Sequence, residues 1–281
     1  MGLGTAVLVT GAGGQVGAAL RAIRPEWTYL TRRDLDVTDE AAMRRVVSEP
    51  CVVVHLAAFT NVDACEADPG YAEAVNAKAT QELARRAQDV EARIVYLSTD
   101  YVFDGKKSSE YFEDDATNPL NQYGRTKLEG ERAVAANGQN VIVRTSWVFG
   151  EGRNFIRAIV QAAHTRSRLE VVADQRGRPT AAADVAAALV PIVEEGRPGV
   201  VHVAGDGDPA TWAEVARVAL HAAGRRAEVV EIDSETWERR ASGPVARRPK
   251  NSVLSLERAR SLSLPLFDWR ESAIAYAKEI A

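Results

Sequence analysis

One stretch decides the fold of this chain of 281 residues: Ala6-Val7-Leu8-Val9-Thr10-Gly11-Ala12-Gly13-Gly14-Gln15-Val16-Gly17. The apolar run at its start is too short for a helix and is typical of a strand buried on both faces. A glycine-rich turn follows directly, and Leu20 and Ile23 continue a helical pattern. This order predicts a dinucleotide-binding turn, in which the backbone approaches a pyrophosphate at a helix N-terminus.

The glycines of this turn have the spacing GxxGxxG instead of the more usual GxGxxG. A glycine-rich turn alone is a weak indication of function. Its position between a strand and a helix is what favours dinucleotide binding. The residues expected to contact the cofactor here are Gly11, Gly13, Gly14, Gln15, Val16 and Gly17.

Trp27–Leu30 is the predicted second strand, and the residues after it bear on the choice of cofactor. An NAD site often has an acidic residue here that binds the ribose hydroxyls. This chain has Arg32 and Arg33 first, and two guanidinium groups suit a 2′-phosphate. We therefore expect a preference for NADPH, with NADH also possible; the alternative is that one or both arginines face solvent. Asp36 and Val37 follow, where an adenine edge would be bound.

Short apolar runs then alternate with helical patterns. Strands are predicted at 51–56, 93–97 and 141–143, helices at 40–47, 71–88 and from 121, and a loop at 59–68. Ala57 and Ala58 are small enough for a cofactor to lie against their backbone. Ser98-Thr99-Asp100 lies at the carboxyl end of a strand, the edge where ligands bind to open parallel sheets. The alternation predicts an α/β fold with a doubly wound, Rossmann-type parallel sheet.

The second half of the chain has a looser pattern. Helices are predicted at 155–163, 182–195, 211–223 and 268–280, and strands at 200–203 and 229–232. We expect residues 1–150 to form a dinucleotide-binding domain, to which the chain returns around 179–204. Residues 151–281 are expected to form mainly a smaller C-terminal lobe that binds substrate.

Tyr123 and Lys127 stand four residues apart at the start of a helical segment, so both lie on one helix face. A tyrosine with a pKa of about 10 is an inefficient acid at neutral pH. A nearby ammonium group favours the phenolate and lowers that pKa, so the pair can exchange a proton with a carbonyl or alcohol oxygen. The alternative is that Tyr123 packs on the sheet and Lys127 is solvated.

The composition is that of an ordinary globular protein, with a net charge of −4. Both signs of charge are interspersed, so no nucleic-acid or anionic-membrane surface is predicted. The sequence has no apolar run long enough to span a bilayer and no basic-then-apolar start, which favours a cytoplasmic location. Cys51 and Cys65 do not have the spacing of a metal site.

These motifs together resemble the extended short-chain dehydrogenase/reductase family, and more closely the dTDP-4-dehydrorhamnose reductases and related dTDP-4-keto-6-deoxysugar 4-reductases. The resemblance covers most of the chain. It is carried by Gly11–Gly17, Ala57–Asp63, Ser98–Phe103, Asn121–Lys127 with Glu129, Arg144–Val148, Asp174–Thr180, and Arg247–Pro249 with Asn251-Ser252.

The resemblance implies that a hydride from NADPH reduces C4 of a dTDP-linked 4-keto-6-deoxy sugar. Tyr123 would act as the general acid, and Lys127 would lower its pKa and hold the nicotinamide ribose. Thr99 matches the hydroxyl that hydrogen-bonds the substrate oxygen. Thr60, Val62 and Trp147 match positions that line the hexose pocket. Residues expected to bind the dTDP part are Gln175, Arg178, Arg247 and Asn251.

Some members of this family form dimers around a magnesium ion held by glutamates. The matching positions here are Ala19 and Ala183, which offer no oxygen to a hard cation. We therefore expect no metal site, and a monomer or weak homodimer without a bridging ion.

Other functions remain open: a 4-reductase making a different deoxysugar, an epimerase or dehydratase, or a dinucleotide-binding regulatory subunit. Asp100-Tyr101 after Thr99 differs from the Asp-Glu pair of the dehydratases, and intact Thr99, Tyr123 and Lys127 argue against a regulatory subunit.

Overall fold

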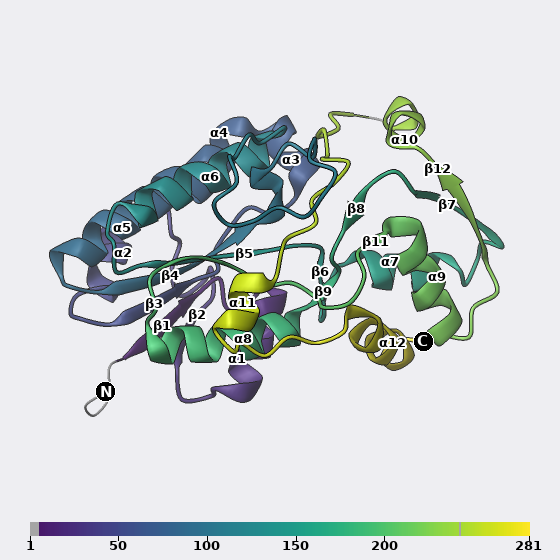
Figure 1. Cartoon of the computed structure of the whole chain (residues 1–281). Helices are drawn as coiled ribbons and strands as arrows, with labels where there is room; N and C mark the ends of the chain where they lie inside the picture. The colour runs from purple at the N-terminus through teal and green to yellow at the C-terminus, as the bar shows by residue number, and fades with distance from the viewer. Residues whose placement is uncertain (1–5, 242) are drawn as a thin grey trace.

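The computed structural model describes residues 6–241 and 243–281. Its centre is a six-stranded sheet with the order β10-β5-β4-β3-β1-β2, in which every neighbouring pair is parallel (Figure 1). The strands are β1 (Val7–Thr10), β2 (Thr28–Leu30), β3 (Val52–His55), β4 (Arg93–Thr99), β5 (Val141–Thr145) and β10 (Gly199–His202). The chain leaves β1 toward β2 and returns to β3 on the other side, so a crevice forms at the carboxyl ends of β1 and β3. The predicted doubly wound parallel sheet is confirmed.

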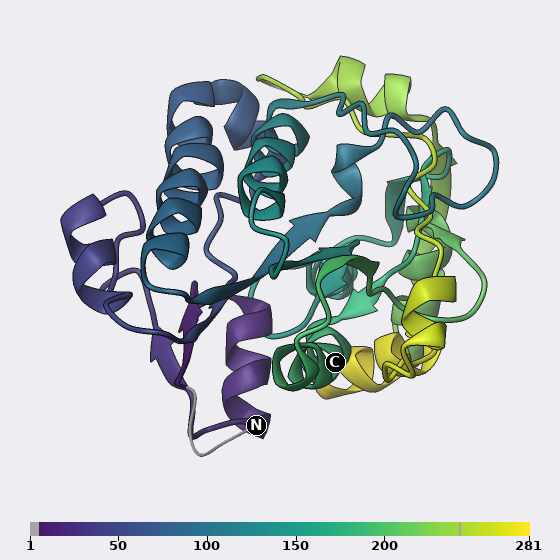
Figure 2. The ribbon, with the colours of Figure 1, turned by 60° about the vertical axis from the view of Figure 1, so that its left-hand side comes forward.

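Helices cover both faces of the sheet (Figure 2). On one face lie α1 (Gln15–Ile23) and α8 (Ala182–Glu195), and on the other α2 (Glu40–Val46), α5 (Ala79–Asp89) and α6 (Gln122–Ala135). Leu20 of α1 and Leu189 of α8 belong to one apolar core, whereas Leu83 of α5 and Val134 of α6 belong to the other. Because both faces are covered, the central strands are mainly apolar on both faces, as their sequences predicted.

The predicted helix at 71–88 consists of α4 (Pro69–Ala72), a π-helical stretch η1 (Glu73–Lys78) and α5. Buried Asn76 lies in the π-helical stretch. Its amide accepts a hydrogen bond from the Phe59 backbone N–H at 2.7 Å and donates to the Thr126 hydroxyl at 3.2 Å. Asn76 therefore ties the segment after β3 to helix α6. π-Helical turns often occur at functional sites.

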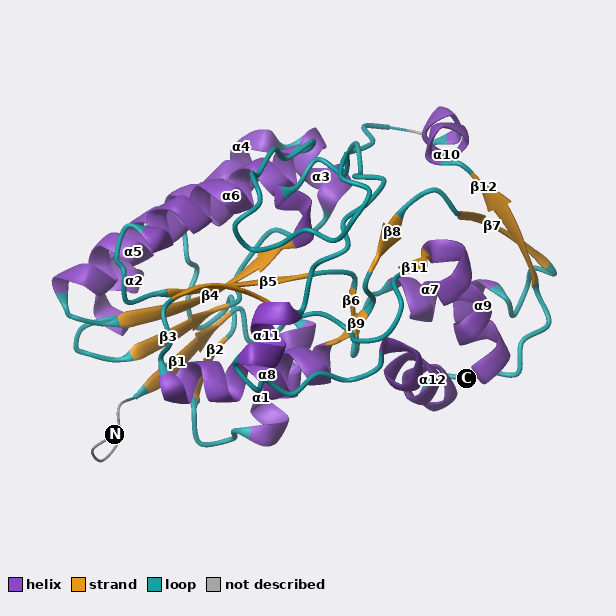
Figure 3. Ribbon diagram, in the orientation of Figure 1, coloured by secondary structure: helices purple, strands orange, loops and turns teal. Residues whose placement is uncertain are grey.

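A second group of elements surrounds its own apolar core (Figure 3). Its helices are α7 (Phe155–Ala162), α9 (Trp212–Ala222), α10 (Ser234–Arg240) and α12 (Trp269–Glu279), and its longest strands are β7 (Arg168–Val172) and β12 (Glu228–Ile232). Shorter strands pair as β6 (Val148–Phe149) with β9 (Thr180–Ala181) and β8 (Arg176–Gly177) with β11 (Ala210–Thr211). The segment that carries α8 and β10 lies in the first sheet, and α11 (Glu257–Ser261) packs near β10.

Side-chain caps fix where the helices begin. Asn121 accepts a hydrogen bond from the Gly124 N–H at 2.8 Å and so starts α6. Thr211 and Glu214 form a capping box at α9, and Asp268 caps α12. The predicted helix starts at residues 211 and 268 are therefore confirmed within one residue.

Two predictions about local structure were incomplete. The expected loop at 59–68 contains the short helix α3 (Val62–Ala67), which Asn61 caps. This helix has one buried residue, Cys65, so it shows no apolar periodicity in the sequence. Strand β7 was not predicted, because it is stabilised by β12, which lies far along the chain.

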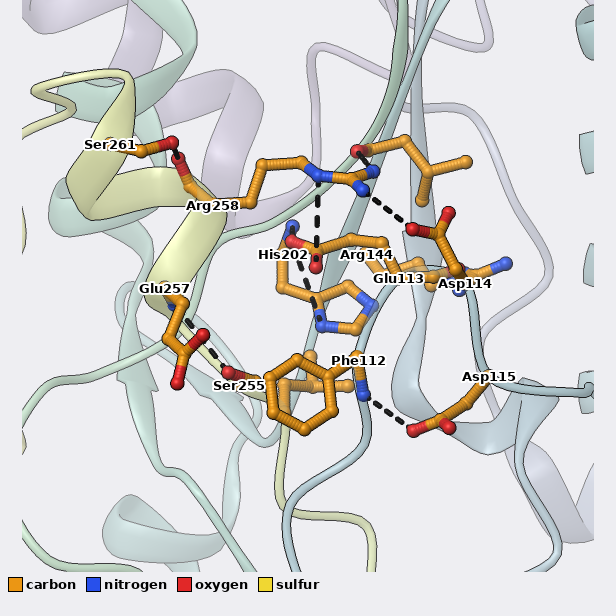
Figure 4. Close-up of polar contacts among 12 residues, drawn as sticks. Phe112, Glu113, Asp114, Asp115, Arg144, His202, Ser255, Glu257, Arg258 and Ser261 are labelled. Atoms are coloured by element: carbon orange, nitrogen blue, oxygen red, sulfur yellow. Dashed lines mark hydrogen bonds and ion pairs between the residues drawn. The ribbon is translucent and has the colours of Figure 1, made fainter.

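A buried charged cluster joins α6 to strand β5 of the sheet. Arg144 of β5 donates two hydrogen bonds to Glu131 of α6, at 2.9 and 2.8 Å, and one to the Glu113 backbone carbonyl at 3.1 Å. In Figure 4, Glu113 lies between His202 and Arg258, and its carboxylate accepts from the His202 backbone N–H at 3.0 Å.

Within the described ranges no helix is long and apolar enough to cross a membrane.

Candidate active site

The glycine turn and the end of β3 close the crevice at the switch point of the sheet. Gly11 has φ +67°, and a Cβ at this position would lie 2.5 Å from the backbone nitrogen of Ala57. Only glycine fits such a close approach. Ala57 and Ala58, both half-buried, therefore stand beside the dinucleotide turn, where the sequence placed them.

The N-terminus of α1 has the properties of an anion site. Gly14 provides no side-chain cap, and the first turn has no acidic residue, so the free N–H groups of Gln15, Val16 and Gly17 remain available to a phosphate. A Cβ at Gly17 would lie 2.6 Å from Ala12, whereas nothing lies within 4 Å of one at Gly13. A closely packed turn with an open outer surface fits a dinucleotide pyrophosphate.

Arg32 and Arg33 are exposed at the end of β2. The guanidinium of Arg32 lies 3.7 Å from Asp36 and above the ring of Tyr71. The Asp36 carboxylate accepts hydrogen bonds from the hydroxyl and backbone N–H of Thr38, which hold the pKa of Asp36 below its usual value. Val37 is buried against the core. Both arginines thus remain accessible to a ligand phosphate.

The three predicted catalytic residues come together at the carboxyl edge of β4. Thr99 is the last residue of β4, and Tyr123 lies in the first turn of α6. The Thr99 hydroxyl is close enough to the phenol to act on its pKa by hydrogen bonding. The ring of Tyr123 meets that of Tyr101 edge to face, with centroids 6.2 Å apart. Strand pairing also places Thr99 beside Thr145 of β5, two residues before Trp147.

Lys127 is almost fully buried one turn after Tyr123. Its ammonium donates a hydrogen bond to the Leu97 carbonyl at 2.7 Å and lies 3.9 Å from the ring centroid of Tyr96. Burial lowers the pKa of Lys127 to about 7, and the charge of Glu131 opposes that fall.

The expectation that Lys127 lowers the pKa of Tyr123 does not describe this geometry. Burial raises the pKa of Tyr123, and the negative charge of Asp100 adds to the rise. The nearby Thr99 hydroxyl opposes the rise. Lys127 points instead at the strand carbonyl.

Residues from both halves of the chain meet above the catalytic edge. Asp63 of α3 accepts hydrogen bonds at 2.9 Å from the Ala246 backbone N–H and from the Arg248 guanidinium. Arg248 also acts on the pKa of Tyr101, so it lies near the catalytic rings. Arg248 was not among the residues expected to bind substrate, and its ion-pair partner Asp63 lies 185 residues away. Thr60 is exposed and Val62 half-buried beside this contact.

Trp147 is held between two neighbours. Its indole stacks on that of Trp212 with centroids 3.6 Å apart and planes at 6°. A Cβ at Gly177 would lie 2.5 Å from its Cε2 atom, so the Gly177 backbone also lies against the ring. Trp147 has a left-handed backbone, with φ +48°. The expected contact between Trp147 and a sugar is therefore limited to the parts of the indole that these neighbours leave open. Trp212 was not predicted.

Three of the four residues expected to bind dTDP have other partners. Gln175 bonds Trp212 at 3.1 Å and Ser234 at 2.9 Å. Asn251 donates to the carbonyls of Lys107 and Ser109. Arg178, 4% exposed, donates to the carbonyls of Leu254, Gly205 and Gly207 and pairs with Glu110. These side chains hold loops together, and their contact with the dTDP part stays a prediction.

Arg247 differs from these three residues. It is exposed, and its backbone carbonyl accepts a hydrogen bond from the Asn121 cap of α6 at 2.9 Å. This bond places Arg247 at the start of the catalytic helix, so it is the member of the expected set that remains suited to a diphosphate.

A Rossmann-type sheet with a glycine turn at its switch point and a Tyr-x-x-x-Lys helix beside it defines a short-chain dehydrogenase/reductase. The chain belongs to the family described as the RmlD substrate binding domain, which matches residues 5–281. It is similar to a dTDP-4-dehydrorhamnose reductase of Sinorhizobium fredii, with 39% identity over 94% of both chains. It is also similar to a dTDP-4-keto-6-deoxy-D-glucose reductase of Streptomyces niveus, with 39% identity over 93% of both.

A solved dTDP-4-dehydrorhamnose reductase from Bacillus anthracis, in complex with NADP, has a TM-score of 0.90 and 31% identity, covering 98% of this chain and 99% of that one. The family resemblance that the sequence motifs indicated is confirmed.

Proposed function

We propose that this protein reduces the C4 ketone of a dTDP-4-keto-6-deoxyhexose with NADPH, and that the substrate is dTDP-4-dehydro-L-rhamnose, which yields dTDP-L-rhamnose. The observation that carries the proposal is that Thr99 and Tyr123 lie close together at the carboxyl edge of the sheet, the edge that also holds the glycine turn after β1. The names of the similar proteins support the substrate class, and the NADP in the Bacillus anthracis structure supports the cofactor.

Each residue has a role that its position supports. NADPH, held by the glycine turn and the N-terminus of α1, supplies the hydride. Tyr123 gives its proton to the oxygen that becomes the C4 hydroxyl, and Thr99 hydrogen-bonds the same oxygen. Lys127 places a positive charge beneath this edge and holds the nicotinamide ribose. Trp147, Thr60 and Val62 border the hexose, and Arg247 binds the diphosphate.

The proposal is tested by supplying dTDP-4-keto-6-deoxyglucose with and without a 3,5-epimerase and following NADPH absorbance. We expect oxidation of NADPH that depends on the epimerase, and a product with the C4 configuration of L-rhamnose. The absence of NADPH oxidation under both conditions would refute the proposed activity.

A second candidate is a 4-ketoreductase for another dTDP-deoxysugar, which the similarity to the Streptomyces niveus reductase supports. This candidate predicts turnover of the keto sugar without the epimerase. The configuration of the product at C4 and C5 distinguishes the two activities directly.

We propose further that the protein is a monomer or a weak homodimer without a bridging metal. Ala19 and Ala183 supply no side-chain oxygen at the positions that match the magnesium-binding glutamates of some family members. Mass and activity are expected to be unchanged in excess EDTA. Dissociation caused by the chelator would contradict this proposal.

A further inference from the structure

Asp100 is a buried carboxyl group at the carboxyl end of β4, beside Thr99. The proposed reaction assigns no role to it. It is 2% exposed, and its Oδ1 atom lies 3.1 Å from the Thr99 hydroxyl oxygen. Its Oδ2 atom is also buried and has no hydrogen-bond partner among residues 6–241 and 243–281. A buried carboxylate oxygen without a partner is costly, whereas a neutral carboxyl group is much less so.

The surroundings of Asp100 contain hydroxyl groups and no paired cation. The groups that face it are Thr99 and Tyr101 on its own segment, Tyr123 of α6, and Ser252 from the second half of the chain. The two nearby cations are directed elsewhere, since Lys127 donates to the Leu97 carbonyl and Arg248 pairs with Asp63. Nothing on these elements therefore stabilises a negative charge at Asp100 by ion pairing.

The hydrogen-bond capacity of Thr99 links Asp100 to the reaction. A hydroxyl group has one proton to donate. If Asp100 is a carboxylate, it can only accept hydrogen bonds. The Thr99 hydroxyl must then donate its proton in the 3.1 Å hydrogen bond to Asp100. The Thr99 oxygen also accepts from the Tyr101 backbone N–H at 3.2 Å. In that state Thr99 has no proton left for an oxygen of the substrate.

We propose that Asp100 acts as a neutral carboxylic acid that donates its proton in a hydrogen bond to Thr99, and thereby frees the Thr99 hydroxyl to donate to the oxygen at C4 of the sugar. This inference rests on the proposed function. Asp100 is a positioning residue, because it acts through Thr99 and no bond to it is made or broken. The group is neutral at the start and at the end of each turnover.

The protonation equilibrium of Asp100 gives the proposal a pH signature. Burial raises the pKa of Asp100 to about 7, and the nearby hydroxyl groups of Ser252 and Thr99, with the backbone N–H groups of Asp100 and Tyr101, oppose the rise. Below that pH the carboxyl group is neutral and Thr99 can donate to the substrate. As the pH rises through about 7, Asp100 ionises and takes back the Thr99 proton. The value of kcat/KM for the sugar should therefore fall over this range.

Asp100→Asn is the decisive variant, because an amide N–H can donate to Thr99 at every pH. At about pH 6 its turnover should lie within about fivefold of the unaltered protein, and the fall through neutral pH should become shallower, because only Lys127, whose pKa burial also lowers to about 7, still titrates there. Asp100→Ala removes the group that takes the Thr99 proton at alkaline pH, so it should show the same shallower fall through neutral pH, with unchanged NADPH affinity. Asp89→Asn, an exposed carboxylate at the end of α5, is the matched control and should leave the pH profile unchanged.

Infrared spectroscopy observes the same carboxyl group without turnover. The unaltered protein should show the carbonyl band of a protonated carboxylic acid at about pH 6, which disappears above neutral pH and is absent from Asp100→Asn. The proposal is overturned if Asp100→Asn is inactive at about pH 6 although it folds and binds NADPH, if its alkaline fall is as steep as that of the unaltered protein, or if the band is missing. If the unaltered protein reduces no keto sugar, the proposed function fails, but the band still reports whether Asp100 is neutral.

Discussion

The ammonium of Lys127 donates a 2.7 Å hydrogen bond to the backbone carbonyl of Leu97, two residues before Thr99. This bond joins α6 to β4, the two elements that supply the acid and the hydroxyl of the site. The aromatic face of Tyr96 lies 3.9 Å away and adds a cation–π contact. Lys127 is therefore fixed in position by the protein itself.

Lys127→Met removes the cation but keeps a long apolar side chain. We expect turnover to fall about 100-fold or more, because the positive charge beneath the catalytic edge is lost, and NADPH affinity to weaken. Steady-state kinetics and a fluorescence titration with NADPH measure the two effects. Lys78→Met, in an exposed ion pair with Glu73, is the control and should match the unaltered protein. Normal turnover in Lys127→Met would refute the assigned role.

Gly177→Ala tests the sugar pocket through the position of Trp147. The added methyl group would lie 2.5 Å from Cε2 of Trp147 and force the indole off the Trp212 stack. We expect the KM for the dTDP sugar to rise about tenfold, the near-ultraviolet circular dichroism of the tryptophans to change, and NADPH affinity to stay constant. Gly138→Ala meets no atom within 4 Å and serves as the control. An unchanged sugar KM despite an altered spectrum would remove Trp147 from the pocket.

Arg33→Ala tests the preference for NADPH. Arg33 is exposed at the end of β2, and loss of one charge-assisted phosphate contact should raise the KM for NADPH about tenfold. The KM for NADH, which has no 2′-phosphate, should not change. Arg45→Ala on α2 is the control for a general loss of surface charge. If the unaltered protein uses NADH more efficiently than NADPH, the arginines have another role.

His202 predicts how stability depends on pH. Burial lowers the pKa of His202 to about 3, whereas an unfolded histidine titrates near 6.5. Below about pH 6.5 the unfolded chain takes up a proton that the folded chain refuses, so the free energy of unfolding falls by up to about 1.4 kcal/mol per pH unit, until about pH 3. His202→Leu should reduce this slope and keep stability at neutral pH, because neither ring nitrogen has a hydrogen-bond partner among the described residues and the contact of Nδ1 with Glu113, at 4.0 Å, is an ion pair only when the ring is protonated.

Denaturant unfolding at a series of pH values measures this effect. His221→Leu, at an exposed position of α9, is the control for replacing an imidazole by leucine. His55 has the same lowered pKa but bonds Thr10 and Thr80, so replacing it should destabilise the protein at every pH. An unchanged acid slope in His202→Leu would contradict the buried, neutral imidazole.

The sequence predicted those features that depend on local spacing. The glycine turn, the central strands and the Tyr123–Lys127 pair lie within short segments, so their patterns could be interpreted without the fold. Asp100 directly follows Thr99 in the quoted motif, at the carboxyl end of a predicted buried strand. That position could have predicted a buried carboxyl group beside Thr99. Helix α3 lacked such a signal, because it depends on the Asn61 cap and a single buried residue.

Contacts between distant segments were not predictable in the same way. Arg178 resembles a phosphate ligand in the sequence, but its partners include Leu254 and Glu110, 76 and 68 residues away. The direction of Lys127 likewise depends on the Leu97 carbonyl, 30 residues earlier. Arginine and lysine have several donors, and only the folded chain shows which acceptors they use.

The turnover of Tyr123→Phe with a dTDP-4-keto-6-deoxy sugar tests the central claim most directly. The substitution removes one hydroxyl group and keeps the ring that packs on Tyr101. With saturating NADPH, the rate of NADPH oxidation should fall about 100-fold or more, while the dissociation constant for NADPH changes by less than about threefold. Turnover equal to that of the unaltered protein would show that Tyr123 is not the acid.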